Sequence, residues 1–260
     1  MLKKLLKYEL KATARTFLSL YIILFAFAII NRLLSPLSNL GLYVPQILSM
    51  IVYVAILVGM FVITFAVMIQ RFYNNLLSAE GYLMFTIPVQ PWKHIVSKLM
   101  VSMMWAAASW LTAIISIFII SSDRNISSDF INEMNNFFGE FFSIFGVSSI
   151  LYFLEGMLIA ITIMASGVLI IYASIAIGHL FSRHRILASV GAFICLITVT
   201  QILFVIIGIT FGNVFTTNRF FNPVAAFHFV TWFGIIFFGA LALGYFMITN
   251  YILSNHLNLE

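Results

Sequence analysis

Few residues of this chain could do chemistry, and Glu155 is the only acidic one within a predicted membrane span. A carboxylate inside a membrane is a candidate functional site. The apolar stretch around it, residues 141–178, is longer than the roughly 20 residues that one crossing needs. Residues 158–177 could span alone, which would leave Glu155 at the outer interface. Two interpretations stay open: a hydrated or structurally paired carboxylate, and a part of an entrance or exit path.

The histidines do not predict a metal site. His179 and His184 share one loop with Arg183 and Arg185, where positive charge opposes the binding of a cation. Loop and interface histidines are therefore expected, and no metal bound by this chain. The remaining histidines are isolated in sequence: His94, His228 and His256.

Sequence motifs of enzymes were not found either. The chain has no His-Glu-x-x-His, no Gly-x-Ser-x-Gly and no cluster of aspartates on one helix. A phosphate-binding Gly-x-x-x-x-Gly-Lys-Ser/Thr loop is also missing. We therefore expect no catalytic residues and no cofactor bound by this chain.

The elements that must position these residues are membrane-spanning helices. The chain is 63% hydrophobic and 8% charged, against about 25% charged residues in an average soluble domain. Its composition predicts an all-α polytopic membrane protein with six transmembrane helices. The candidate spans are residues 17–34, 46–69, 99–120, 150–177, 187–211 and 229–253.

These spans divide the chain into three parts. We expect a cytoplasmic amphipathic helix over residues 1–16, a transmembrane domain over 17–253 and a short cytoplasmic tail over 254–260. Within the transmembrane domain, the two longer connections are at 70–98 and 121–149. The first of them carries most of the distinctive sequence.

Basic residues predict the orientation, because Lys and Arg collect on the cytoplasmic side of membrane proteins. With the N-terminus inside, only three of the 13 basic residues lie on the outer side: Arg32, Arg124 and Arg219. Both termini are therefore expected in the cytoplasm. The net charge of +5 then reflects this bias, and a nucleic-acid partner is not expected.

The N-terminal segment carries a basic stripe of Lys4, Lys7, Lys11 and Arg15, spaced by three and four residues. On a helix these side chains share one face, which suits anionic lipid headgroups. They are thus expected at the membrane surface. Whether the helix only rests on the membrane or packs against a cytosolic partner stays open.

The connection at 70–98 predicts a short helix. Ser78 is a plausible N-cap, and the carboxylate of Glu80 favours a helix N-terminus. A helix over residues 79–85 would be stopped by Pro88, and Pro91 would begin the next helix. The aromatic and apolar side chains of the short helix need cover from lipid headgroups, from the rest of the chain or from a soluble partner.

Residues 77–98 carry a resemblance to a known family. Their core, Glu-Gly-Tyr-Leu-Met-Phe-Thr-Ile-Pro followed by Pro-Trp, resembles the second intracellular segment of bacterial ABC-2-type transporter permeases. The segment Leu-Lys-Tyr-Glu-Leu-Lys-Ala-Thr, residues 6–13, is similar to the start of small permease subunits of that group. The layout is similar over nearly the whole chain, but the specific motif covers about twenty residues.

The resemblance implies a permease of six spans in the bacterial plasma membrane. Two permease copies, identical or paralogous, would form the path, and a separate cytosolic ATPase would bind ATP and Mg. It would dock on a coupling helix at residues 79–85. An aromatic-rich outer helix at 137–149 departs from the family pattern, where such a helix lies between spans five and six. The implied coupling residues are Glu80, Gly81, Tyr82, Phe85, Pro88 and Trp92.

For such an exporter, the scarcity of charged residues along the path and the aromatic content of 16% favour an amphipathic or lipophilic cargo, such as a peptide antibiotic. The alternative is a membrane scaffold, or the anchor of a regulatory complex, that transports nothing. Composition does not separate these two hypotheses.

Overall fold

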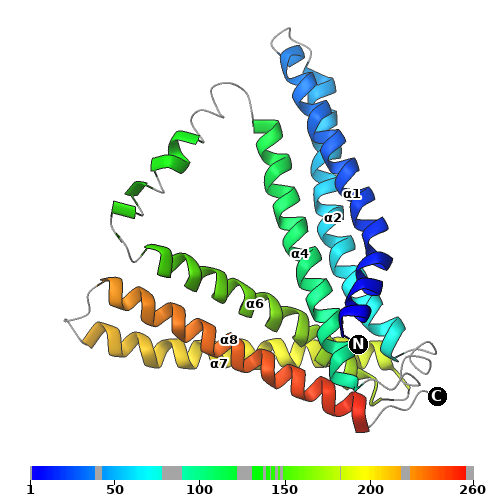
Figure 1. The fold of residues 1–260 in the computed structure, drawn as a ribbon, viewed down its shortest axis with the longest axis vertical. Helices are drawn as coiled ribbons and strands as arrows, with labels where there is room; N and C mark the ends of the chain where they lie inside the picture. The colour runs from blue at the N-terminus through cyan, green and yellow to red at the C-terminus, as the bar shows by residue number, and fades with distance from the viewer. Residues whose placement is uncertain are drawn as a thin grey trace. The chain divides into compact units, whose positions relative to one another are not determined.

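A computed structural model of the chain contains six long helices (Figure 1). They are α1 (Leu2–Ser38), α2 (Tyr43–Leu77), α4 (Pro91–Ser121), α6 (Ser149–Gly178), α7 (Arg185–Thr217) and α8 (Pro223–Asn255). The structure describes residues 2–38, 43–77, 90–121, 131–136, 139–140, 142–143, 146, 149–181, 183–217 and 223–255.

Each of the six helices is long and apolar enough to cross a membrane. The described residues contain no strand. The prediction of an all-α polytopic membrane protein with six spans is therefore confirmed. Pro91 begins α4 as expected, since proline suits the first helical position. In the connection between α4 and α6, residues 131–136, 139–140 and 142–143 are helical.

The helices extend well beyond the predicted spans, and α1 differs most from expectation. It runs without interruption over 37 residues from Leu2 to Ser38, which corresponds to about 55 Å. Residues 2–16 are thus the first turns of α1 and not a separate helix. No glycine or proline occurs before Pro36, so nothing in the sequence ends the helix after residue 16.

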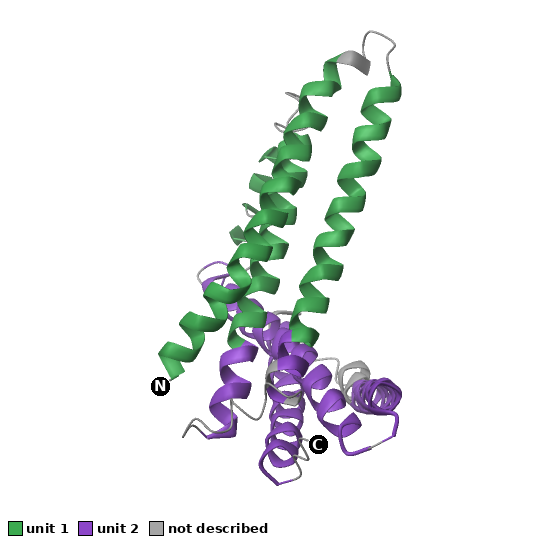
Figure 2. Ribbon diagram, turned by 90° about the vertical axis from the view of Figure 1, so that its right-hand side faces the viewer, with its two compact units in different colours: residues 1–70, 100–143 green, residues 71–99, 144–260 purple. Residues whose placement is uncertain are grey.

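The chain divides into two compact units (Figure 2). Unit 1 holds residues 1–70 and 100–143, and unit 2 holds residues 71–99 and 144–260. Unit 1 therefore contains α1 and most of α2 and α4. Unit 2 contains α6, α7 and α8 together with the last turns of α2 and the first turns of α4.

Unit 1 is held together by hydrogen bonds between its helices. The buried hydroxyl of Ser109 on α4 meets the Tyr21 hydroxyl of α1 at 2.9 Å and the Thr64 hydroxyl of α2 at 3.0 Å. Farther along, Tyr53 of α2 bonds to Ser116 of α4 at 2.8 Å. Such bonds associate helices where lipid removes the hydrophobic driving force, at about 0.6 kcal/mol each.

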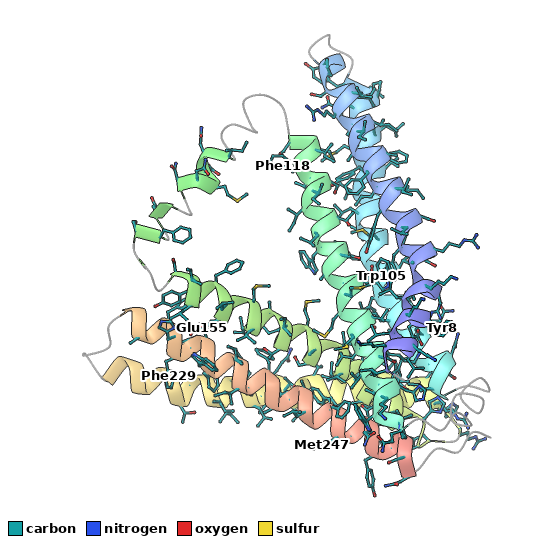
Figure 3. All side chains as sticks on the ribbon, viewed as in Figure 1. Tyr8, Trp105, Phe118, Glu155, Phe229 and Met247 are labelled. Carbon is teal, nitrogen blue, oxygen red and sulfur yellow. The ribbon has the colours of Figure 1, made fainter. Side chains whose placement is uncertain are left out.

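Trp105 of α4 is buried in this unit and lies beside α1 (Figure 3). Its ring stacks on Phe17 with centroids 4.5 Å apart. Its indole nitrogen donates to Thr13 at 2.8 Å. A large aromatic surface and a satisfied polar group together fix the rotation of α1 against α4.

In unit 2, α6 packs against both α7 and α8. The half of α6 that ends at Gly178 is almost fully buried, whereas the most apolar stretch of α7 buries none of its residues. A large apolar face of α7 is thus left for lipid or for another chain. Hydroxyls in this unit bond mostly within their own helix, as in Thr198 to the Ile194 carbonyl at 2.7 Å and Ser174 to the Ile171 carbonyl at 2.7 Å.

The turn between α6 and α7 depends on a close approach at Gly178. A Cβ atom placed there would lie 2.6 Å from the backbone nitrogen of Ser189 and 2.7 Å from its Cα. Backbone atoms cannot yield as a flexible side chain can. Gly178 is therefore needed where α7 folds back on α6.

Candidate functional site

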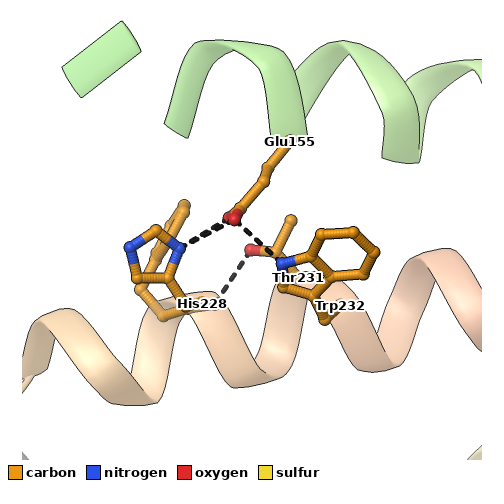
Figure 4. A network of polar contacts seen from close by, with 5 residues as sticks. Glu155, His228, Thr231 and Trp232 are labelled. Carbon is orange, nitrogen blue, oxygen red and sulfur yellow. Dashed lines mark hydrogen bonds and ion pairs between the residues drawn. The ribbon is translucent and has the colours of Figure 1, made fainter. Parts of the chain in front are cut away.

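Glu155 of α6 is paired with two residues of α8 (Figure 4). The Nδ1 atom of His228 lies 2.9 Å from Oε1 and 2.8 Å from Oε2 of the carboxylate. The indole nitrogen of Trp232 donates to Oε1 at 2.9 Å. The carboxylate is buried, and its protein contacts join two helices of unit 2.

Helix periodicity brings this cluster together. Tyr152 and Glu155 are three residues apart on α6, and His228 and Trp232 are four apart on α8, so each pair shares one helix face. The Tyr152 ring stacks on the His228 imidazole at 4.1 Å with planes 13° apart. The rings of Phe227 and Tyr152 meet edge to face, with their centroids 5.0 Å apart. The ion pair is thus flanked by aromatic rings.

The donors and acceptors restrict where protons lie in the cluster. An indole N–H can only donate, so Oε1 of Glu155 accepts the bond from Trp232. At His228, either Nδ1–H donates to an ionised carboxylate, or a protonated carboxyl group donates to a bare Nδ1. The second ring nitrogen of His228 points away from the carboxylate (Figure 4). The arrangement can hold or share a proton.

The cluster lies toward one end of its spans. Glu155 is in the second turn of α6, a helix of 30 residues, which corresponds to about 45 Å. A hydrocarbon core is about 30 Å thick. If α6 is centred in the membrane, Glu155 lies close to the boundary of the hydrocarbon layer.

A metal does not fit this site well. The described residues contain no group of three or more side chains from His, Cys, Asp and Glu that could hold a metal ion. Glu155 and His228 supply two such groups, and their partner Trp232 offers only a donor.

A second notable region surrounds the segment 78–89, which itself lies outside the described residues. The last turns of α2 and the first turns of α4 belong to unit 2, and each has buried side chains. Phe72 stacks on Tyr172 of α6 with centroids 4.0 Å apart and planes 9° apart. The buried anchor consists of Phe72, Leu76, His94, Ile95, Ser97 and Lys98.

Most of the coupling residues predicted from the sequence fall in that undescribed segment. They are Glu80, Gly81, Tyr82, Phe85 and Pro88. Trp92 is described: its ring is 40% exposed, its Nε1 donates to Gln90 at 2.8 Å, and the Lys93 ammonium lies 5.4 Å from the ring centroid. Trp92 therefore lies on the exposed side of the first turn of α4.

The basic stripe of α1 is exposed along its length: Lys4, Lys7, Lys11 and Arg15. Glu9, Thr13 and Phe17 are buried on the opposite face. The stripe is therefore available to a partner or a lipid surface, while the other face is part of unit 1.

The turn after α6 lines an open, mostly apolar depression of about 320 Å³. Its lining consists of Phe181, Arg183, His184, Leu187 and Ala188. Nearby, burial and the positive charge of Arg185 lower the pKa of His179 below its ordinary value of 6.5. The His179 ring packs against Tyr73 at 5.3 Å, and its buried Nε2 has no hydrogen-bond partner among the described residues.

The pairing of Glu155 with His228 was not foreseen, because His228 was treated as isolated in the sequence. A signal was present. His228 and Trp232 lie four residues apart near one end of the last span, as Glu155 lies near one end of the fourth. Polar residues near corresponding ends of neighbouring parallel spans can meet, and this comparison would have suggested the pair.

Fold and site together define an all-α, multi-pass membrane protein with a buried carboxylate–imidazole pair between two of its candidate spans. No protein-family model, no curated protein and no solved structure matches the chain.

Proposed function

We propose that this protein is the membrane-spanning permease subunit of an ABC-type exporter in a bacterial plasma membrane. A separate cytosolic ATPase binds ATP and Mg and docks on the coupling helix proposed at residues 79–85, inside the segment 78–89. Two permeases, identical or paralogous, enclose the path. The similarity of residues 77–98 to ABC-2-type permeases suggested this function, and the six apolar helices are compatible with it.

The observation that carries the proposal is the burial on both sides of residues 78–89. Phe72 and Leu76 precede this segment, Ile95 follows it, and all three are 0% exposed. A connection that only links two spans needs no such anchor. A segment that receives a docking protein does, because a force applied to it must reach the helices rather than deform the connection.

The anchor also indicates a route for that force. Phe72 belongs to the last turns of α2 and stacks on Tyr172 of α6. Movement of the docked segment would therefore shift α6. Because α6 packs on α7 and α8, unit 2 would respond as a whole, which suits an alternating-access cycle driven by closure of an ATPase pair.

The distribution of charge supports the proposed orientation. The anchor, the basic stripe of α1 and the α6–α7 turn carry most of the basic residues. By the positive-inside rule these parts face the cytoplasm, together with both termini. Glu155 then lies toward the outer side, and an amphipathic or lipophilic cargo, such as a peptide antibiotic, suits a path with few charges.

Purification tests the proposal first. The tagged protein is extracted from its native membranes in mild detergent, and the proteins that accompany it are identified by mass spectrometry. A stoichiometric ATPase with a phosphate-binding loop is the expected result. Reproducible isolation without any ATPase would count against the exporter and favour the membrane scaffold.

A pair of variants then tests the docking segment. Glu80→Ala is expected to uncouple ATP hydrolysis from cargo movement in reconstituted vesicles. Glu140→Ala, an exposed carboxylate of the other long connection, is the matched control and should leave coupling intact. Unchanged coupling in a normally inserted Glu80→Ala protein would contradict docking at this segment.

A further inference from the structure

Charge balance at Glu155 requires a compensating positive charge. The carboxylate side chain is 10% exposed, and its described partners are the His228 ring nitrogen and the Trp232 indole. With a neutral imidazole and an ionised carboxylate, the largely buried pair would carry a net charge of about −1, which is unfavourable. One added proton makes the pair neutral overall.

From this geometry we infer that Glu155 and His228 together form a binding site for one proton. The ligand is the proton itself, and the inference does not depend on an exporter function. Trp232 positions the carboxylate through its hydrogen bond to Oε1. Tyr152 covers the imidazole face by stacking at 4.1 Å.

One atom, Nε2 of His228, reports whether the pair holds its proton. Within the 2.8 Å contact between Nδ1 and Oε2, the shared proton can sit on either atom, and in both cases Nε2 also carries a hydrogen. When the pair loses its proton, Nδ1–H must still face the carboxylate, because two bare acceptors at this distance would repel each other. Nε2 is then bare. The occupancy of the site thus equals the protonation of Nε2.

Tyr152 is the one other titratable group among the described side chains that contact the pair. On α6 the group nearest His228 is Tyr152, and on α8 the adjoining Phe227, Thr231 and Trp232 do not titrate. The packed helix α7 contains only Arg185 and Cys195 as titratable residues of its sequence. Arg185 begins α7 next to the far end of α6, roughly 35 Å along that helix from Glu155.

Nitrogen NMR of the full chain in lipid bilayers tests the inference. The protein is labelled with ¹⁵N-histidine, and His228→Gln assigns the ring signals of His228. The expected result is a wild-type Nε2 that keeps its hydrogen to a higher pH than Nε2 of Glu155→Gln. A wild-type Nε2 that is already bare at pH 6 would overturn the proton site without any comparison of variants.

Two variants with opposite expected effects sharpen the test. In Glu155→Gln, the midpoint of the pH-dependent ¹⁵N shifts of His228 should fall by about one pH unit or more, which is a tenfold loss of proton affinity, because the stabilising anion is gone. Trp232→Phe removes a hydrogen bond that favours the anion, so the midpoint should rise. An unchanged midpoint in Glu155→Gln, or a fall of equal size in Trp232→Phe, would overturn the inference.

Discussion

Phe72 of α2 and Tyr172 of α6 form a stacked pair, with ring planes 9° apart and both side chains almost fully buried. The contact fixes the end of α2 to α6 within unit 2. It lies only six residues before the segment to which we assign ATPase docking. A force applied to that segment would therefore reach α6 through this stack.

Phe72→Ala should destabilise this end of unit 2. Removing a fully buried aromatic ring leaves a cavity and costs about 3 kcal/mol or more. We expect a clear fall in the thermal unfolding midpoint of the detergent-solubilised protein. Phe65→Ala on the same helix, where the ring is 49% exposed, is the control and should change the midpoint little. Equal effects of the two variants would contradict the anchoring role of Phe72.

Ser109→Ala should loosen unit 1 by about 1 kcal/mol, since it removes two interhelical hydrogen bonds of about 0.6 kcal/mol each. Tyr21 and Thr64 retain backbone acceptors at Trp105 and Met60, which limits the loss. Unfolding in increasing SDS measures the difference. Ser19→Ala is a suitable comparison, because the Ser19 hydroxyl bonds to the Arg15 carbonyl of its own helix. A loss of stability in Ser19→Ala as large as that in Ser109→Ala would contradict a stabilising role of the Ser109 hydrogen bonds between helices.

Gly178→Ala should disturb the fold where α7 turns back on α6, because the new methyl group meets the backbone of Ser189. Gly167→Ala on the same helix has no atom within 4 Å of the new Cβ among the described residues, and it should be neutral or stabilising by up to about 1 kcal/mol. Limited proteolysis near residues 178–185 compares the two. Equal protection in both variants would argue against a close approach.

Acidification should destabilise the α6–α7 turn through His179. Burial and Arg185 lower its pKa in the folded state, so the unfolded chain binds the proton more readily. The resulting stability is present above the unfolded value near 6.5 and is lost as the pH falls below it. Hydrogen exchange of residues 179–190 at pH 7.5 and pH 5.5 detects this loss. The variant His179→Gln should show a smaller difference between the two pH values; an undiminished difference would assign the effect to another group.

The spans could be predicted from the sequence because hydropathy and length alone select a membrane helix. The bounds could not, as α1 shows: the polar residues before residue 17 looked like a separate element, yet no helix-breaking residue separates them from the span. Backbone hydrogen bonding continues through Lys and Arg as readily as through Leu. Polarity marks where a helix meets water and does not mark where it ends.

Of the candidate site, the sequence predicted Glu155 and not its partners on α8. Glu155 was identified because a carboxylate in an apolar segment is unusual, but its partner lies 73 residues away. Single-sequence periodicity shows which residues share a face of one helix, and it carries no information on which faces of different helices meet. The same limit applies to the anchor around residues 78–89. Its residue Phe72 stacks on Tyr172 of another helix, 100 residues later in the sequence.

The dependence of Glu155 on α8 has a consequence for biosynthesis. Many hydroxyls of α6 and α7 bond to carbonyls of their own helix, so they enter lipid without outside help. Glu155 instead awaits His228 and Trp232, which leave the ribosome more than 70 residues later, on the order of ten seconds at ordinary translation rates. During that interval the carboxyl group of Glu155 has neither of its α8 partners. Integration of this protein is thus completed only when the last helix arrives.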